Sequence, residues 1–263
     1  MEETQTKGAV LVGARGVAPG KLPGWYVTAY PGAREASGVF RGSARDGGGR
    51  ADLAEWADPG ERSEQMAASR ARVTVRRYCA ANRLNRLGTL TYAGSGCHDP
   101  MALRADMARF FVNLRCALGG KPLPYLWVPE WHPKGHGLHV HFAIGRYIRR
   151  SAIHAAWGHG FVHIKLLGNL PVGSTSLDEA RKAASYLSKY AGKAIGEDRV
   201  PGLHRYEVAQ RFQPERIPVY GPTLAVAMGR AAGVMGGPAD DFDTSNQWEG
   251  WAGPLAMRAS WAS

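Results

Sequence analysis

Two histidines spaced two residues apart are the side chains of this sequence best placed to do chemistry. His139 and His141 lie within Leu138–Ile144, where they alternate with apolar residues in the pattern of a β-strand. Because residues two apart on a strand share a face, both imidazoles point the same way and the apolar residues between them point into the core. Two imidazoles on one rigid face can bind a single divalent cation.

Glu130 supplies a third ligand if the preceding strand pairs with this one. Tyr125–Trp131 is predicted to be a strand, and HPKGHG at 132–137 is predicted to be the turn of a hairpin. This turn length places Glu130 opposite His139 on the same face, whereas a shift of one residue in register points it away. Two histidines and one carboxylate leave coordination positions open for water and phosphate oxygens, as a metal-dependent nuclease requires.

The remaining histidines leave alternatives open. His132 and His136 lie in the turn, where they ligate the metal, contact phosphate or are simply exposed to solvent. The spacing of His154, His159 and His163 does not converge on one face, and we interpret these three as structural. The histidine pair itself also has an ordinary interpretation, as half-exposed residues of a sheet, so it needs support from a second motif.

That second motif lies on the helix predicted for residues 177–194, for which Ser176 is the expected N-cap. At about 100° per residue, its reactive side chains fall within one arc of about 100°, separate from the apolar arc that packs on the sheet. These side chains are Tyr186, Lys189, Tyr190 and Lys193. A tyrosine phenolate can attack a phosphodiester and hold the strand as a phosphotyrosine that is later resealed, and a nearby ammonium group favours the phenolate. The alternative is an ordinary amphipathic helix with solvated lysines.

Charge and composition fit a nucleic-acid partner. The 263 residues carry a formal net charge of +11 and have a pI of about 9.8, which favours a polyanion because Lys and Arg displace counterions from phosphates. Three cysteines without a CxxC pair argue against a disulfide framework and against a cysteine zinc site, so a reducing cytoplasm is the expected location. No membrane contact is expected, since no uncharged apolar run of about 18 residues occurs, and no ATPase module, since GxxxxGK[ST] is absent.

The order of the predicted elements indicates an α+β fold with a central antiparallel β-sheet flanked by helices. The elements are a helix over 61–83, a strand over 86–92, a helix over 100–118, the hairpin 125–144, a helix over 151–157, a strand over 161–167 and the tyrosine helix. We therefore place a catalytic domain at residues 61–200. Residues 1–60 are expected to be a flexible or weakly structured extension with one short strand near 25–29, and 201–263 a C-terminal extension with a partly disordered tail.

Three motifs, in this order along the chain, resemble those of the HUH endonucleases, specifically the rolling-circle replication initiators of plasmids and phages. They are LGTLTY at 87–92, GLHVHFAI at 137–144 and YLSKYAGK at 186–193. The resemblance covers about residues 86–195 and implies a sheet-centred fold related to the RNA-recognition fold, a Mg²⁺ or Mn²⁺ ion and a 5′-phosphotyrosine intermediate. The first motif lacks the longer consensus of some relatives, so its expected role is structural.

The resemblance also implies roles for individual residues. The implied metal ligands are His139, His141 and Glu130. Tyr190 is the expected nucleophile, because it lies in the KYxxK pattern of single-tyrosine plasmid initiators. Tyr186 occupies the place of the second tyrosine of two-tyrosine phage initiators and is the expected second nucleophile. Lys189 and Lys193 would steady the scissile phosphate or the phenolate.

The implied partners are single-stranded or origin DNA, with a host helicase and a host polymerase completing replication. A relaxase or transposase of the same superfamily is an alternative, although relaxases usually place the tyrosine ahead of the histidine strand. A non-catalytic nucleic-acid-binding module is a second alternative, in which loss of the tyrosine hydroxyls has no effect. A zinc hydrolase is a third, and it predicts activity without a covalent DNA adduct.

Overall fold

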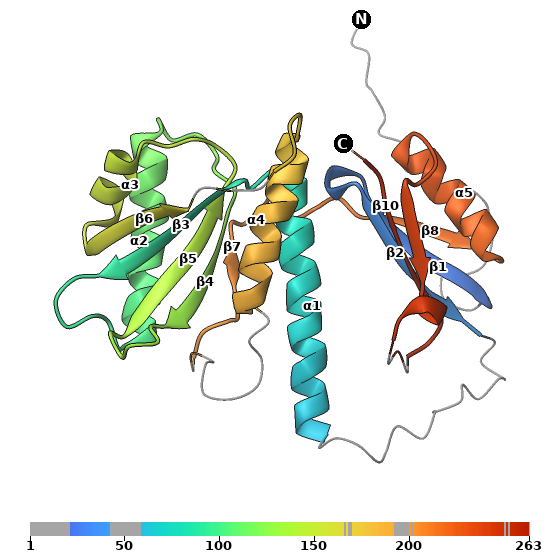
Figure 1. The fold of residues 1–263 in the computed structure, drawn as a ribbon, viewed down its shortest axis with the longest axis horizontal. Helices are drawn as coiled ribbons and strands as arrows, with labels where there is room; N and C mark the ends of the chain where they lie inside the picture. The colour runs from blue at the N-terminus through green and yellow to red at the C-terminus, as the bar shows by residue number, and fades with distance from the viewer. Residues whose placement is uncertain are drawn as a thin grey trace, which may run out of the picture.

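A computed structural model of the protein describes residues 22–42, 59–165, 167, 170–191, 200, 202–249, 251 and 253–262. Within these residues the chain forms an α+β fold of two antiparallel sheets and five α-helices (Figure 1), which confirms the predicted fold class. The helices are α1 (Pro59–Ala81), α2 (Pro100–Ala117), α3 (Arg150–Trp157), α4 (Ser176–Ala191) and α5 (Leu224–Met235). The strands are β1 (Gly24–Tyr30), β2 (Glu35–Arg41), β3 (Arg86–Tyr92), β4 (Tyr125–Trp131), β5 (Leu138–Ile144), β6 (Gly160–Lys165), β7 (Glu207–Val208), β8 (Ile217–Gly221), β9 (Asp241–Thr244) and β10 (Ala256–Ser260).

One sheet has the strand order β6-β3-β5-β4-β7, and we call it the histidine sheet because β5 carries His139 and His141. Each pair of neighbouring strands is antiparallel. The run β3-α2-β4-β5-α3-β6, with β3 and β5 in the centre, is the split βαβ arrangement of ferredoxin-like folds. The strands predicted at 86–92, 125–131 and 138–144 are confirmed with the same bounds.

Helices α2 and α3 cover one face of the histidine sheet and form an aromatic core with it. The Phe110 ring of α2 lies 5.7 Å from the Phe142 ring of β5 and 6.0 Å from the Trp157 ring of α3, both edge-on. Gly88 of β3 pairs with Phe142, and a Cβ at this glycine would overlap the Phe142 ring. Glycine is therefore the residue that lets this ring lie close over the central strand.

Replacing Phe110 by alanine is expected to destabilise the protein by about 3–5 kcal/mol, because the phenyl ring is fully buried and its loss leaves a cavity between helix and sheet. Urea denaturation followed by circular dichroism measures the change. Met101 lies on the same helix with 58% of its surface exposed, so Met101→Ala is the matched control and should shift the free energy of unfolding by about 0.5 kcal/mol or less. Equal effects of the two substitutions would contradict this core assignment.

Helices α4 and α1 pack against each other and lie on the opposite face of the histidine sheet (Figure 1). The face of α4 that packs there consists of small apolar side chains, as the sequence predicts. The buried residues of this layer include Ala183, Ala184 and Leu187 of α4, Val75 and Tyr78 of α1, and Leu126 and Val128 of β4. Because small side chains let α4 lie close to the strands, residues on its neighbouring arc reach the sheet surface.

The N-terminus of α4 is capped one residue earlier than predicted. The Asp178 carboxylate accepts hydrogen bonds from the backbone N–H and the hydroxyl of Thr175, at 2.9 and 2.8 Å, and Thr175 Oγ1 accepts one from the Asp178 N–H at 3.3 Å. This reciprocal pair is a capping box. Thr175 therefore serves as the cap that the sequence analysis assigned to Ser176, since an acidic residue three positions later favours it.

The second sheet joins the two ends of the described chain, and we call it the terminal sheet. Its strand order is β8-β1-β2-β10-β9, and α5 packs on one face, with Trp25, Val27 and Trp261 among the buried residues. The sequence analysis predicted only one short strand near 25–29 and missed this sheet. Residues 1–21 and 43–58 of the expected N-terminal extension lie outside the described residues.

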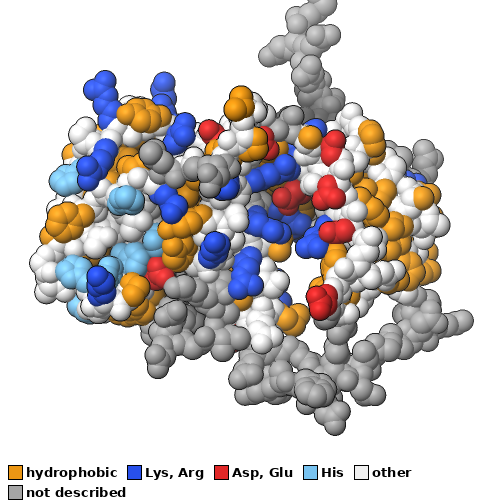
Figure 2. Space-filling model, viewed as in Figure 1, with side chains coloured by type: hydrophobic (Ala, Val, Ile, Leu, Met, Phe, Trp, Pro, Cys, Tyr) orange, Lys and Arg blue, Asp and Glu red, His pale blue; other side chains and the backbone are white. Residues whose placement is uncertain are grey.

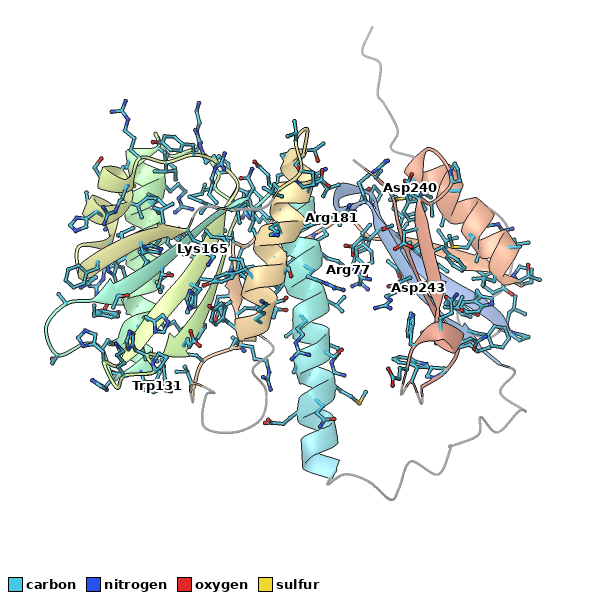
Figure 3. The ribbon with its side chains drawn as sticks, in the orientation of Figure 1. Arg77, Trp131, Lys165, Arg181, Asp240 and Asp243 are labelled. Atoms are coloured by element: carbon cyan, nitrogen blue, oxygen red, sulfur yellow. The ribbon has the colours of Figure 1, made fainter. Side chains whose placement is uncertain are left out.

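Arginines of α1 and α4 join the two lobes (Figure 3). The Arg77 guanidinium donates to Ser37 Oγ at 2.7 Å, forms an ion pair with Glu35 at 3.6 Å and lies over the Tyr30 ring. Arg181 donates to the Trp261 carbonyl at 3.2 Å. The terminal sheet is thus fastened to the helices that carry the tyrosines. None of the helices in the described part of the chain has the length and apolar character of a membrane span.

Candidate metal and tyrosine site

The register of the β4–β5 hairpin brings the three predicted metal ligands together. Glu130 pairs directly with His139, as expected, and the turn closes through the His132 N–H, which donates to the Gly137 carbonyl at 2.8 Å. His139 Nε2 lies 3.0 Å and His141 Nε2 lies 2.8 Å from the same carboxylate oxygen, Oε2 of Glu130. The two Nε2 atoms are 3.2 Å apart. All three side chains are buried, so the cluster is a compact polar group inside the protein.

These residues fit a divalent cation. Two imidazole nitrogens and one carboxylate oxygen converge on one another, and they form the group of potential metal ligands found among the described residues. Octahedral ligands at about 2.1 Å from an ion, at right angles to each other, are separated by about 3.0 Å. The separations of 2.8 to 3.2 Å match that spacing. One face of such an octahedron is therefore provided, and the other positions remain for water and substrate oxygens.

Thr89 of β3 positions one of the histidines. Its Oγ1 lies 3.1 Å from His141 Nδ1, on the strand that pairs with β5 opposite this residue. When Nδ1 carries the proton it donates to this hydroxyl, and Nε2 then presents its lone pair to a cation. The sequence analysis expected the first motif to be structural. The structure shows that its threonine also contacts a candidate metal ligand.

Replacing Thr89 by valine is expected to weaken Mn²⁺ binding about 10- to 100-fold, because His141 loses the partner that fixes its ring. Titration calorimetry of the purified protein with MnCl₂ measures the change. Thr91 is the matched control, since it lies on the same strand and face and pairs with His139, whose Nδ1 has no hydrogen-bond partner among the described residues. Thr91→Val should bind Mn²⁺ like the wild type, and similar losses in both variants would refute the role of Thr89.

The two tyrosines of α4 lie directly over the histidine cluster. The Tyr190 ring stacks on the His141 ring, with centroids 4.0 Å apart and an interplanar angle of 25°. Tyr186 is one helical turn earlier, and its hydroxyl accepts a hydrogen bond of 2.7 Å from the Tyr190 hydroxyl. Burial, this hydrogen bond and the negative charge of Glu130 raise the pKa of the Tyr190 phenol above its usual value. A positive charge beside the phenol would be needed to lower it.

A lysine from the sheet lies beside the tyrosines. Lys165, at the end of β6, places its Nζ 4.2 Å from the centre of the Tyr186 ring. Sequence analysis did not single it out, although alternation along 161–167 puts it on the same face as the site. Lys189, which the sequence analysis placed beside the phenols, has an exposed side chain. Lys193 lies outside the described residues.

The turn histidines lie near the cluster without joining it. The His132 ring is 5.4 Å from the His139 ring, and its Nδ1 accepts a hydrogen bond from the Lys134 N–H at 3.2 Å. His136 Nε2 lies 3.0 Å from the Tyr92 carbonyl oxygen, which holds the turn against β3. His136 therefore has a structural contact, and His132 lies at the edge of the candidate metal site.

Positive charge is concentrated on the part of the molecule that carries this site. Residues 59–216 contain 24 of the 33 Lys and Arg residues but 11 of the 22 Asp and Glu residues. Figure 2 shows Lys and Arg side chains around the lobe of the histidine sheet and over the central helices, with Asp and Glu gathered toward the terminal sheet. A polyanion is therefore attracted to the histidine-sheet lobe.

Part of the chain matches a family of known proteins. Residues 85–195, which run from the start of β3 to just beyond α4, match the family described as replication-associated protein ORF2. No curated protein and no solved structure matches the chain significantly. The matched region contains the histidine cluster, both tyrosines and Lys165, and the match supports a replication initiator family for this part of the chain.

Proposed function

We propose that the protein is a rolling-circle replication initiator that nicks and rejoins single-stranded DNA with a divalent metal and a tyrosine nucleophile. The observation that carries the proposal is the stacking of Tyr190 on His141, within a buried cluster that also holds Glu130 and His139. A family of replication-associated proteins typically has nuclease activity, and the match over residues 85–195 agrees with this chemistry.

Glu130, His139 and His141 are the residues that would hold the metal, with Mg²⁺ or Mn²⁺ as the proposed ion. A divalent cation bound there supplies Lewis-acid polarisation of the scissile phosphate. The chain itself provides the rest. Basic side chains of the histidine-sheet lobe attract the DNA, and α4 holds the phenols over the ligands at a fixed distance.

The bond exchange is a transesterification. The Tyr190 oxygen loses its proton and forms a bond to phosphorus, the bond from phosphorus to the 3′ oxygen breaks, and that oxygen takes up a proton. The products are a 5′-phosphotyrosine and a free 3′-hydroxyl, which a host polymerase extends behind a host helicase. Tyr186 is within hydrogen-bonding distance of Tyr190, so the second strand transfer can use its phenol in the same place.

Formation of a covalent protein–DNA adduct tests the proposal. The protein is incubated with 5′- and 3′-labelled single-stranded origin candidates and Mn²⁺, and the products are separated on a denaturing gel. We expect a labelled band at the mass of the protein from the 3′-labelled strand only, and none when EDTA replaces Mn²⁺. Cleavage without an adduct would favour a metal-dependent hydrolase, and binding without cleavage a non-catalytic module.

A further inference from the structure

An exposed phenylalanine lies on the same sheet face as the proposed active site. Phe161 of β6 has 66% of its surface exposed, and β6 is an edge strand of the histidine sheet. Its neighbours on the core side, such as Val162, are buried beneath α3. Since an aromatic ring in this position gains nothing from the core, packing does not explain its presence.

The register places Phe161 in one row with the metal ligands. Phe161 pairs with Thr91, Thr91 pairs with His139, and His139 pairs with Glu130. Paired residues on antiparallel strands share a face, and neighbouring strands lie about 4.8 Å apart. The Phe161 and His139 backbones are therefore about 10 Å apart across the sheet, a short span for a nucleic-acid strand whose sheet-based sites contact about 4–16 nucleotides.

Positive and polar side chains continue along this strand face. His163 and Lys165 follow Phe161 at intervals of two, both are exposed, and Lys165 ends beside the Tyr186 ring (Figure 3). The face of β6 thus presents an aromatic ring, an imidazole and an ammonium group in a line beside the site. An aromatic platform combined with cations is the surface that binds unpaired bases and their phosphates.

We propose that Phe161 is a base-stacking platform that holds a nucleotide of single-stranded DNA close to the reacting phosphate, with His163 and Lys165 facing the DNA backbone. This inference rests on the proposed function for the identity of the ligand. A duplex keeps its bases stacked on one another, so the platform selects single strands. Phe161 is a positioning residue, since it lies two strands away from the metal ligands.

Binding measured without metal tests the platform separately from catalysis. Fluorescence anisotropy of a fluorescein-labelled oligothymidylate is recorded in EDTA, where no cleavage occurs. Phe161→Ala is expected to weaken binding about 5- to 150-fold, the range that loss of one base–aromatic stack gives. Phe161→Trp should restore it, and binding to a labelled duplex should be the same in all variants.

Phe242 provides the matched control. It is an aromatic residue, 42% exposed, on β9, the edge strand of the terminal sheet, so Phe242→Ala should leave oligothymidylate binding unchanged. The inference is overturned if Phe161→Ala binds the single strand as the wild type does, if it weakens duplex binding equally, or if the wild type binds no single strand. An effect of Phe161 without any adduct in the wild type would remove the nicking proposal alone, and an adduct with normal binding of Phe161→Ala would remove this inference alone.

Discussion

Replacing both Tyr186 and Tyr190 by phenylalanine is expected to abolish the covalent protein–DNA adduct, a loss of at least about 10⁴-fold in its rate of formation. Phenylalanine keeps the ring that stacks on His141 and removes only the hydroxyl that would attack phosphorus. The fold and single-strand binding should therefore persist. A denaturing gel with labelled single-stranded DNA and Mn²⁺ measures the adduct, and thermal melting of both proteins checks the fold.

The single variants separate the roles of the two phenols. Tyr190→Phe should slow adduct formation by about 100-fold, because the remaining Tyr186 ring lies 6.1 Å from the His141 ring instead of 4.0 Å, and misplacement of a reacting group is costly. Tyr186→Phe should still form the adduct and fail in the second transfer. Tyr147, 75% exposed and remote from the cluster, gives the control Tyr147→Phe, which should behave as the wild type. An adduct in the double variant would show that the nucleophile is elsewhere.

Replacing Glu130 by glutamine is expected to weaken Mn²⁺ binding by more than about 100-fold, since losing a ligand should exceed the roughly 10- to 100-fold cost of losing a residue behind a ligand. Adduct formation should fall with it. In the metal-free protein the substitution removes a buried negative charge, so the free energy of unfolding should stay within about 1 kcal/mol of the wild type or rise. The variant therefore separates metal binding from folding.

The stability gained from metal gives the sharpest measurement of this effect. At a Mn²⁺ concentration about 100 times its Kd, the wild type should gain about 2.7 kcal/mol, whereas a protein that binds about 100-fold more weakly gains about 0.4 kcal/mol. Chemical denaturation with and without Mn²⁺ measures both. Glu207→Gln, on β7 of the same sheet and paired with Arg104, is the control and should keep the full gain. A normal gain in Glu130→Gln would exclude this carboxylate as a ligand.

The sequence alone predicted the local parts of the site. Alternation around His139 and His141 indicated the strand, the length of the turn indicated the register that sets Glu130 against His139, and helical periodicity put Tyr186 and Tyr190 on one face. These relations are short-range, since each depends on residues within one helix or one hairpin. Their geometry is fixed by the 2.0- and 3.6-residue periods of the backbone.

Only the tertiary structure decided which segments distant in the chain meet. The terminal sheet pairs β1 with β8 and β2 with β10, across most of the chain, and neither end alone has the pattern of a sheet. Thr89 beside His141 and Lys165 beside Tyr186 come from strands that the chain brings together only through its sheet order. A period along one segment shows which face a side chain occupies, whereas the partner across that face depends on the packing of the whole molecule.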